Sequence, residues 1–111
     1  MKEHEQIVFL EAVSYMEHHM GEAVRVADIA GAIHVSESRL QRSFHACAGT
    51  SVHEYLLSIK LRRAMEELQK GQRIGNVAEI CGFANRNHFS YCFKKEFGIN
   101  PSQVKKKLEM P

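Results

Sequence analysis

The sequence predicts an all-α fold in which two helix-turn-helix lobes are joined by a long central helix, with about seven helices in all. Two observations predict it. Residues 51–69 contain neither Gly nor Pro and carry two apolar sets at helical spacing, and a pattern of about 50 residues occurs on both sides of them. We expect a single domain over residues 1–111, with lobe one at about 5–50, the connecting helix at about 51–69 and lobe two at about 72–107.

The connecting helix is predicted from its two apolar stripes. They consist of Val52, Tyr55, Leu56 and Ile59, and of Leu61, Ala64, Met65 and Leu68. The second stripe begins nine residues after the first, which at about 100° per residue places it on the opposite side of the helix. A helix of this kind packs against two separate units. We expect a capping box of Ser51 and Glu54 at its start, and a stop at Lys70 and Gly71.

Lobe one is predicted to begin with a helix over residues 5–20, whose apolar stripe is Phe9, Val13, Met16 and Met20, with Leu10 beside it. A short helix at residues 26–33 follows. A tight link through His34 and Val35 leads to the N-cap Ser36 and to a helix over 37–48, which Gly49 ends. Two short helices with such a turn are typical of a helix-turn-helix.

The helix over 37–48 carries two different faces. Leu40, Phe44 and Cys47 form an apolar stripe. A first polar row lies on another face at the same kind of spacing and consists of Ser38, Gln41, Arg42 and His45.

Lobe two repeats this arrangement. Val77, Ala78, Ile80 and Cys81 lie in a short helix, Gly82 and Phe83 form the turn, and Asn85 is the expected N-cap of a helix over 86–97 that ends at Gly98. The offset between the copies is 48 before the turn and 49 after it, so the second turn holds one extra residue. At an offset of 49 the second polar row is Asn87, Ser90, Tyr91 and Lys94, with Arg86 added at the helix start. We expect a last short helix to open at Asn100 and Pro101 and to carry Lys105–Lys107.

Charge and composition indicate the class of partner. Net charge is only +2, but residues 1–22 carry one Lys and five Glu, whereas the rest carries 14 basic and 8 acidic residues. A basic body favours a polyanionic partner. Because no apolar run approaches the roughly 18 residues of a membrane span, and the start is too acidic for a signal peptide, we expect a soluble cytoplasmic protein without membrane contact. The cysteines, Cys47, Cys81 and Cys92, are expected to be reduced and buried.

Residues 77–103, VAEICGFANRNHFSYCFKKEFGINPSQ, resemble the second helix-turn-helix signature of the arabinose-regulator (AraC/XylS) transcription factors. The first copy resembles the same family through Ser36, Leu40, Gln41, Arg42, Phe44, Gly49 and the run from Lys60 to Ala64. The similarity extends from residue 5 to about 107. Four positions depart from it: the family often has Arg at Tyr91, Tyr-Arg at Val104-Lys105 and Gly at His34. We expect an uncommon backbone conformation at His34.

The resemblance implies sequence-specific binding of double-stranded DNA at a promoter or operator, through two helix-turn-helix motifs in adjacent major grooves, and transcriptional regulation. Arg42 and Arg86 suit guanine, and Gln41 and Asn87 suit adenine, because each offers two hydrogen bonds to one base edge. Ser38, His45, Ser90 and Tyr91 complete the predicted base contacts. The predicted phosphate contacts are Lys60, Arg62, Arg63, Lys94, Lys95, Lys105 and Lys106.

The resemblance also implies RNA polymerase as a partner and an effector or receiver domain outside this chain. We predict no cofactor and no catalysis, since the sequence offers no third group to orient a Cys-His pair and no Gly-rich loop. Two alternatives remain open at this point. His88 with Cys92, or His45 with Cys47, offers a partial metal site, although zinc needs three or four ligands. In the second alternative, the chain is a helical protein-interaction module that does not bind DNA.

Overall fold

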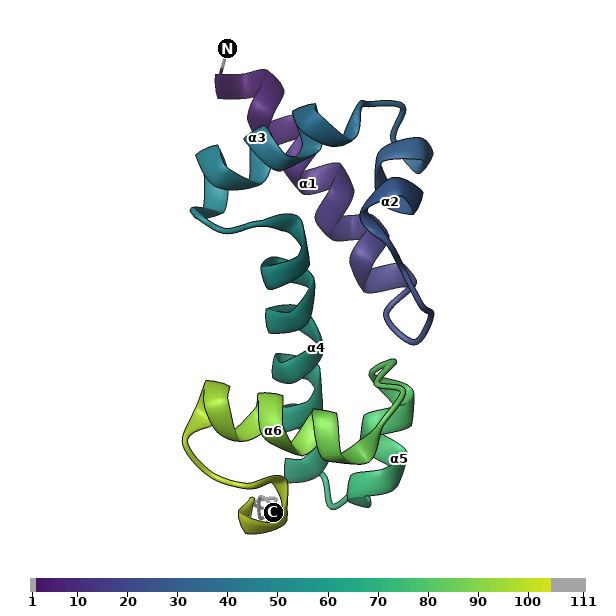
Figure 1. Ribbon diagram of the computed structural model, residues 1–111, viewed down its shortest axis with the longest axis vertical. Helices are drawn as coiled ribbons and strands as arrows, with labels where there is room; N and C mark the ends of the chain where they lie inside the picture. Colours follow the sequence, from purple (N-terminus) through teal and green to yellow (C-terminus); the bar gives the residue numbers. More distant parts are fainter. Residues whose placement is uncertain (1, 105–111) are drawn as a thin grey trace, which may run out of the picture. The chain divides into compact units, whose positions relative to one another are not determined.

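The computed structural model describes residues 2–104, and all regular secondary structure in that range is helical (Figure 1). Six α-helices are followed by one 3-10 helix, which confirms the predicted all-α class. Their bounds are α1 Lys2–His18, α2 Val26–Ala32, α3 Glu37–Ala48, α4 Val52–Gln69, α5 Ile74–Ile80, α6 Arg86–Phe97 and the 3-10 helix η1 Pro101–Gln103. None of the helices in this range is both long and apolar enough to cross a membrane. Lys105–Lys107 lie outside the described residues.

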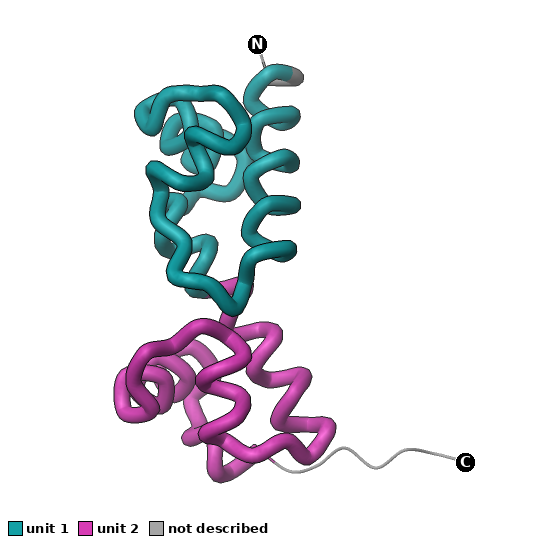
Figure 2. Tube along the Cα trace, turned by 90° about the vertical axis from the view of Figure 1, so that its right-hand side faces the viewer, with its two compact units in different colours: residues 1–57 teal, residues 58–111 magenta. Residues whose placement is uncertain are grey.

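Residue contacts divide the described chain into two compact units, coloured separately in Figure 2. Unit 1 ends at Leu57 and unit 2 begins at Ser58, so α4 contributes its first turns to one unit and the remainder to the other. All eight residues of the two predicted α4 stripes are buried or half-buried. The predicted capping box is present: Ser51 N–H donates to Glu54 Oε1 at 2.9 Å, and Glu54 N–H donates to Ser51 Oγ at 3.1 Å.

Unit 1 is built around contacts of α1 with α2 and α3. The rings of Phe9, Phe44 and Tyr55 meet edge to face, with centroids 4.8 to 5.4 Å apart, and join α1, α3 and the start of α4. The buried side of α1 is rotated from the predicted stripe. Its most buried side chains are Val8, Ala12 and Met16, whereas Phe9 and Val13 are half-buried and Leu10 is 63 % exposed. The predicted stripe left out Val8 and Ala12, which form a row with Met16 at i, i+4 and i+8, because helical spacing alone fits either row.

Unit 2 has a phenylalanine-rich core. α6 packs against α5 and η1, and Phe89 lies 5.0 Å from Phe83 and 5.7 Å from Phe93 between ring centroids. Val77 and Cys81 contribute fully buried side chains from the α5 segment, although Ile80 is exposed.

The turns of the two helix-turn-helix motifs share one hydrogen-bond pattern. Val35 N–H donates to Ala30 O at 3.0 Å, and Phe83 N–H donates to Ala78 O at 2.9 Å, which is the long bond of a Schellman motif in each copy. This motif needs a left-handed residue just after the helix. His34 has φ +61° and Gly82 has φ +79°, so the expectation of an uncommon conformation at His34 is confirmed.

The helices after the turns, α3 and α6, are also equivalent. Ser36 Oγ accepts from Arg39 N–H at 3.1 Å, and Asn85 Oδ1 accepts from Asn87 N–H at 2.7 Å, so both predicted N-caps are confirmed. Gly49 and Gly98 end the helices in the left-handed conformation. The buried residues are Leu40, Ser43 and Phe44 in α3, and Phe89, Cys92 and Phe93 in α6, an offset of 49 throughout. The repeat therefore extends from sequence to packing.

The prediction of three buried cysteines is wrong at one position. Cys81 and Cys92 are buried, whereas Cys47 is exposed. Cys47 has the right angular position on α3 but lies in its last turn, where the buried stripe has already ended at Phe44. Helical periodicity gives the direction of a side chain but not the extent of the surface packed against it.

Candidate nucleic-acid interface

The first polar row lies on the outward face of α3, away from Leu40, Ser43 and Phe44. Ser38, Arg42 and His45 are exposed at i, i+4 and i+7 and therefore project from one side of the helix. The three side chains offer a hydroxyl, a guanidinium and an imidazole to an external partner.

Gln41 differs from the other members of this row. It is half-buried, and its Oε1 accepts a hydrogen bond from Val52 N–H at 3.0 Å, the first amide of α4. The first amides of a helix have no partner within the helix, so this contact satisfies one of them and ties α3 to α4 within unit 1. Its amide oxygen is thus already engaged, which argues against the predicted bidentate contact to adenine.

The second polar row begins directly after the N-cap of α6. Arg86, Asn87 and Tyr91 are exposed, with 65 % of Tyr91 accessible to solvent, and Ser90 is half-buried. Asn85, which precedes the row, is occupied as the cap through hydrogen bonds from Asn87 and His88 amides. The row is therefore presented by a helix whose start is fixed by its own cap.

The cationic side chains fall into two groups. Arg62, Lys94 and Lys95 are exposed and form no ion pair within residues 2–104. Lys60, in contrast, is half-buried with Nζ 5.7 Å from the centre of the Phe83 ring, and this burial lowers the pKa of Lys60. Lys105 and Lys106 lie outside the described residues.

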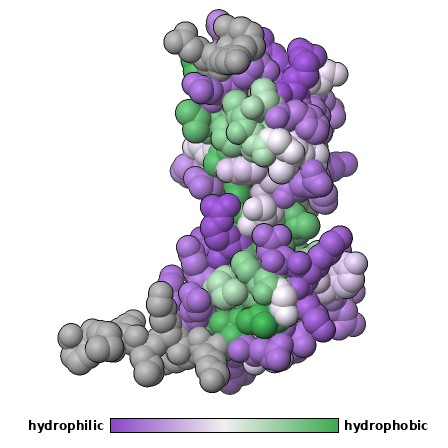
Figure 3. Space-filling view, turned by 90° about the vertical axis from the view of Figure 1, so that its left-hand side faces the viewer, coloured by the Kyte–Doolittle hydropathy of each residue, from purple (hydrophilic) through white to green (hydrophobic). Residues whose placement is uncertain are grey.

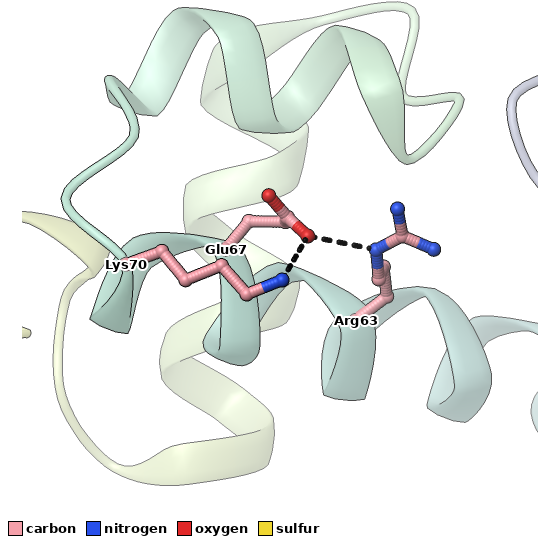
Figure 4. A network of polar contacts seen from close by, with 3 residues as sticks. All are labelled: Arg63, Glu67 and Lys70. Carbon is pink, nitrogen blue, oxygen red and sulfur yellow. Dashed lines mark hydrogen bonds and ion pairs between the residues drawn. The ribbon is translucent and has the colours of Figure 1, made fainter. Parts of the chain in front are cut away.

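Arg63 is held by a buried carboxylate that the sequence analysis missed. Glu67 Oε2 accepts from Arg63 Nε at 3.0 Å and from Lys70 Nζ at 3.3 Å (Figure 4). The Glu67 side chain is 8 % exposed, and the hydrogen bond from Arg63 lowers its pKa. The i, i+4 and i, i+3 spacing of the three charges was the available signal. Arg63 is thus less free to bind phosphate than Arg62.

The partial metal sites that the sequence left as an alternative remain incomplete in the described chain. Cys92 Sγ lies 3.6 Å from His88 Nε2, but burial raises the pKa of the Cys92 thiol, and metals bind the thiolate. No group of three or more His, Cys, Asp or Glu side chains in residues 2–104 is arranged to hold a metal ion. His45 and Cys47 are both exposed.

A hollow of about 650 Å³ lies beside the start of α6, entirely within unit 2. Arg86 of the second polar row lines it together with Arg73, a residue to which the sequence analysis assigned no role. The polar lining is completed by Gln72, Asn76 and Ser102.

Hydrophobic patches interrupt the hydrophilic surface on the face drawn in Figure 3. The large apolar side chains exposed in the described chain are Ile7, Leu10, Ile80, Tyr91 and Ile99. Ile7 and Leu10 stand three residues apart on α1 and therefore share one face of that helix.

Comparison with known proteins gives three main findings. A family described as a helix-turn-helix domain matches residues 29–107. The chain is 36 % identical over 92 residues to the transcriptional regulator GbdR of Pseudomonas aeruginosa, a match that covers 82 % of this chain and 25 % of GbdR. It is 40 % identical over 76 residues to the transcriptional activator RhaR of Pectobacterium atrosepticum, covering 68 % of this chain and 27 % of RhaR.

Among solved structures, the chain is similar to a transcriptional regulator with an AraC-type DNA-binding domain from Chromobacterium violaceum. The TM-score is 0.85 at 35 % identity, with 89 % of each chain covered. The chain spans about a quarter of the length of GbdR and RhaR.

Proposed function

Because the chain belongs to the AraC family of helix-turn-helix proteins, we propose that it binds double-stranded DNA sequence-specifically through α3 and α6 and regulates transcription. One observation carries the proposal beyond family membership. α3 and α6 have equivalent caps, equivalent preceding turns and the same three buried positions. Each helix therefore presents a polar row on its outward face. Two equivalent recognition helices in one chain suit a bipartite site that occupies adjacent major grooves.

Solvent-accessible members of the two rows supply the base contacts. Arg42 donates two hydrogen bonds to guanine, and Asn87 pairs with adenine through its amide. Ser38, His45, Ser90 and Tyr91 make single contacts or touch a thymine methyl group. Gln41 positions α4 instead, because its oxygen already accepts from Val52.

Phosphate contacts come from exposed cations, which position the protein without distinguishing bases. Arg62, Lys94 and Lys95 are free for this role in the described chain, and Lys105 and Lys106, which lie outside the described residues, are further candidates from the sequence. Lys60 and Arg63 serve chiefly within unit 2, where they contact Phe83 and Glu67.

The remaining partners follow from the family. The duplex is a promoter or operator, the protein acts in the cytoplasm without catalysing a reaction, and it contacts RNA polymerase. An effector or receiver domain outside this chain supplies the signal, as the greater length of GbdR and RhaR allows.

Selection of bound sequences from a random duplex pool, followed by titration of binding against salt, tests this function. We expect a selected bipartite site and a linear fall of log affinity with log salt concentration. Arg42→Ala should weaken binding to that site by about 1 to 3 kcal/mol and relax preference at one position, whereas Lys95→Ala should weaken all duplexes alike. Equal loss of specificity from both variants contradicts the assignment of Arg42.

A second candidate is a protein-interaction module, which the exposed Ile7 and Leu10 on α1 favour. Such a module would lack the salt-dependent affinity for random duplex. If the wild-type chain has no salt-dependent affinity for random duplex, the protein-interaction module is the better assignment.

A further inference from the structure

The hollow beside α6 has the lining of an anion site. Two arginines, Arg73 and Arg86, line it together with the neutral polar residues Gln72, Asn76 and Ser102, and no Asp or Glu is among the lining residues. Neither arginine forms an ion pair within the part of the chain that the structure describes. Two like charges therefore border one hollow without a counter-charge from the protein.

Arg73 contributes no capping hydrogen bond at its place in the fold. It is the N-cap of α5, where a side-chain oxygen normally accepts from the first amides, and no side-chain cap hydrogen bond is present. A guanidinium has donors only and cannot fill that role. The position would favour Ser, Thr, Asp or Asn on grounds of stability alone.

We propose that this hollow is a phosphate-binding site and that it takes a diester phosphate of the DNA backbone next to the groove contacted by α6. Guanidinium forks match phosphate oxygens through paired, charge-assisted hydrogen bonds, and the amide groups of Gln72 and Asn76 add neutral donors. A volume of about 650 Å³ leaves room for the phosphate and its flanking sugars.

This inference rests on the proposed function and changes one part of it. Arg86 is the first residue of α6, and the sequence assigned it to guanine, whereas its place in the hollow with Arg73 assigns it to the backbone. The phosphate held there fixes the register of α6, and Asn87 and Tyr91 then make the base contacts.

Arg73→Ser separates binding from folding. A serine can cap α5, so we expect an unchanged or higher Tm. Removal of one guanidinium should lower affinity roughly tenfold at low salt for every duplex and reduce the salt slope by about one unit. Asn76→Asp, which places a carboxylate in the hollow in the first turn of α5, should also weaken all duplexes while α5 stays folded.

The chain supplies a matched control in the other repeat. Arg25 is the N-cap of α2 and precedes Arg73 by 48 residues, but Glu37 begins α3 where Arg86 begins α6. Arg25→Ser removes the same charge from a site without the second guanidinium and should change the salt slope less. An equal change in both variants, no change in Arg73→Ser, or a loss confined to one base position overturns the proposal.

A titration with inorganic phosphate, monitored by NMR of the arginine Nε–Hε signals, tests the phosphate site separately from the proposed DNA binding. If the wild-type chain binds no duplex but phosphate shifts the Arg73 and Arg86 signals, and Asn76→Asp abolishes those shifts, the hollow is a phosphate site that takes a free phosphate and the DNA source is wrong. If the chain binds duplex but neither phosphate nor DNA shifts these signals, the phosphate site itself is wrong.

Discussion

The charged side chains of unit 2 differ in how tightly neighbouring residues hold them. Glu67 engages Arg63 and Lys70, and Phe83 covers Lys60, whereas Arg62, Lys94 and Lys95 reach solvent without a partner in the described chain. Held charges have already lost much of their freedom and hydration, so they contribute to packing. The free ones retain their charge for a polyanion.

Glu67→Gln tests the held group. The hydrogen bond from Arg63 lowers the pKa of Glu67 below the ordinary glutamate value of 4.5, so the unfolded chain takes up this proton more readily than the folded one. We expect the variant to unfold with about 1 kcal/mol less free energy at pH 7, measured by urea unfolding. The difference should persist down to about pH 4.5 and shrink as pH falls through the lowered pKa.

Glu66→Gln is the control for this experiment, because Glu66 is exposed and forms no ion pair in the described chain. It removes the same charge from the adjacent position and should leave stability nearly unchanged. A difference between Glu67→Gln and wild type that does not vary with pH would show that the carboxylate charge is not what Arg63 stabilises.

Single residues were the hardest scale to predict from sequence. The exposed members of the polar rows were identified correctly as outward-facing, because helical spacing determines direction. The contact of Gln41 with the Val52 amide could not be predicted, because this amide becomes available only when a second helix starts beside Gln41. Glu67 was missed because a charged residue is normally expected at the surface. Its burial becomes understandable only when its ion pairs with Arg63 and Lys70 are considered.

At the scale of elements, the two turns place different residues in the same left-handed conformation. His34 in unit 1 has a Cβ atom that crowds the backbone at φ +61°, while Gly82 in unit 2 has none at φ +79°. We predict that His34→Gly stabilises the protein by up to about 1 kcal/mol and that Gly82→Ala destabilises it by about 1 kcal/mol, both measured by urea unfolding.

Opposite signs are the informative part of this pair of variants. Glycine also gains freedom in the unfolded chain, which reduces the benefit at position 34. If His34→Gly is strongly destabilising, the exposed imidazole makes a contact that outweighs the backbone strain.

Helix boundaries were the feature that the sequence predicted most accurately. α3 and α6 begin and end where Ser36, Gly49, Asn85 and Gly98 predicted, because caps are local and depend on residues within one turn. The face of α1 was placed less well, since it depends on which helices approach it and not on α1 alone. The end of α4 was predicted within one residue from Lys70 and Gly71.

At the scale of the whole molecule, the repeat predicted two equivalent halves, and it did so through residues at fixed offsets. The hollow in unit 2 could not be predicted from the repeat. It joins the start of α5, the start of α6 and η1, and its two arginines occupy positions that hold Arg25 and Glu37 in the other half. A repeat indicates where two halves agree, whereas this site arises where they differ.

The connection between the units gives a final prediction about bipartite binding. One Ala inserted after Leu57 falls where the contacts divide, so residues on either side keep their own unit. The insertion lengthens α4 by about 1.5 Å and rotates one unit against the other by about 100°, whatever their relation in the wild type. Both units should stay helical by circular dichroism, and salt-dependent binding to arbitrary duplex should survive.

Affinity for the selected bipartite site, in contrast, should fall toward the non-specific level, a loss of up to about 10³ or more, because the two recognition helices no longer meet their grooves together. One Ala inserted after Gly21, in the exposed segment between α1 and α2, adds the same residue without rotating the units and should bind like wild type. If the Leu57 insertion is folded and binds the selected site as tightly as wild type, α4 does not fix the angle between the units. Each helix-turn-helix would then find its half-site independently, and affinity would reflect their tethering alone.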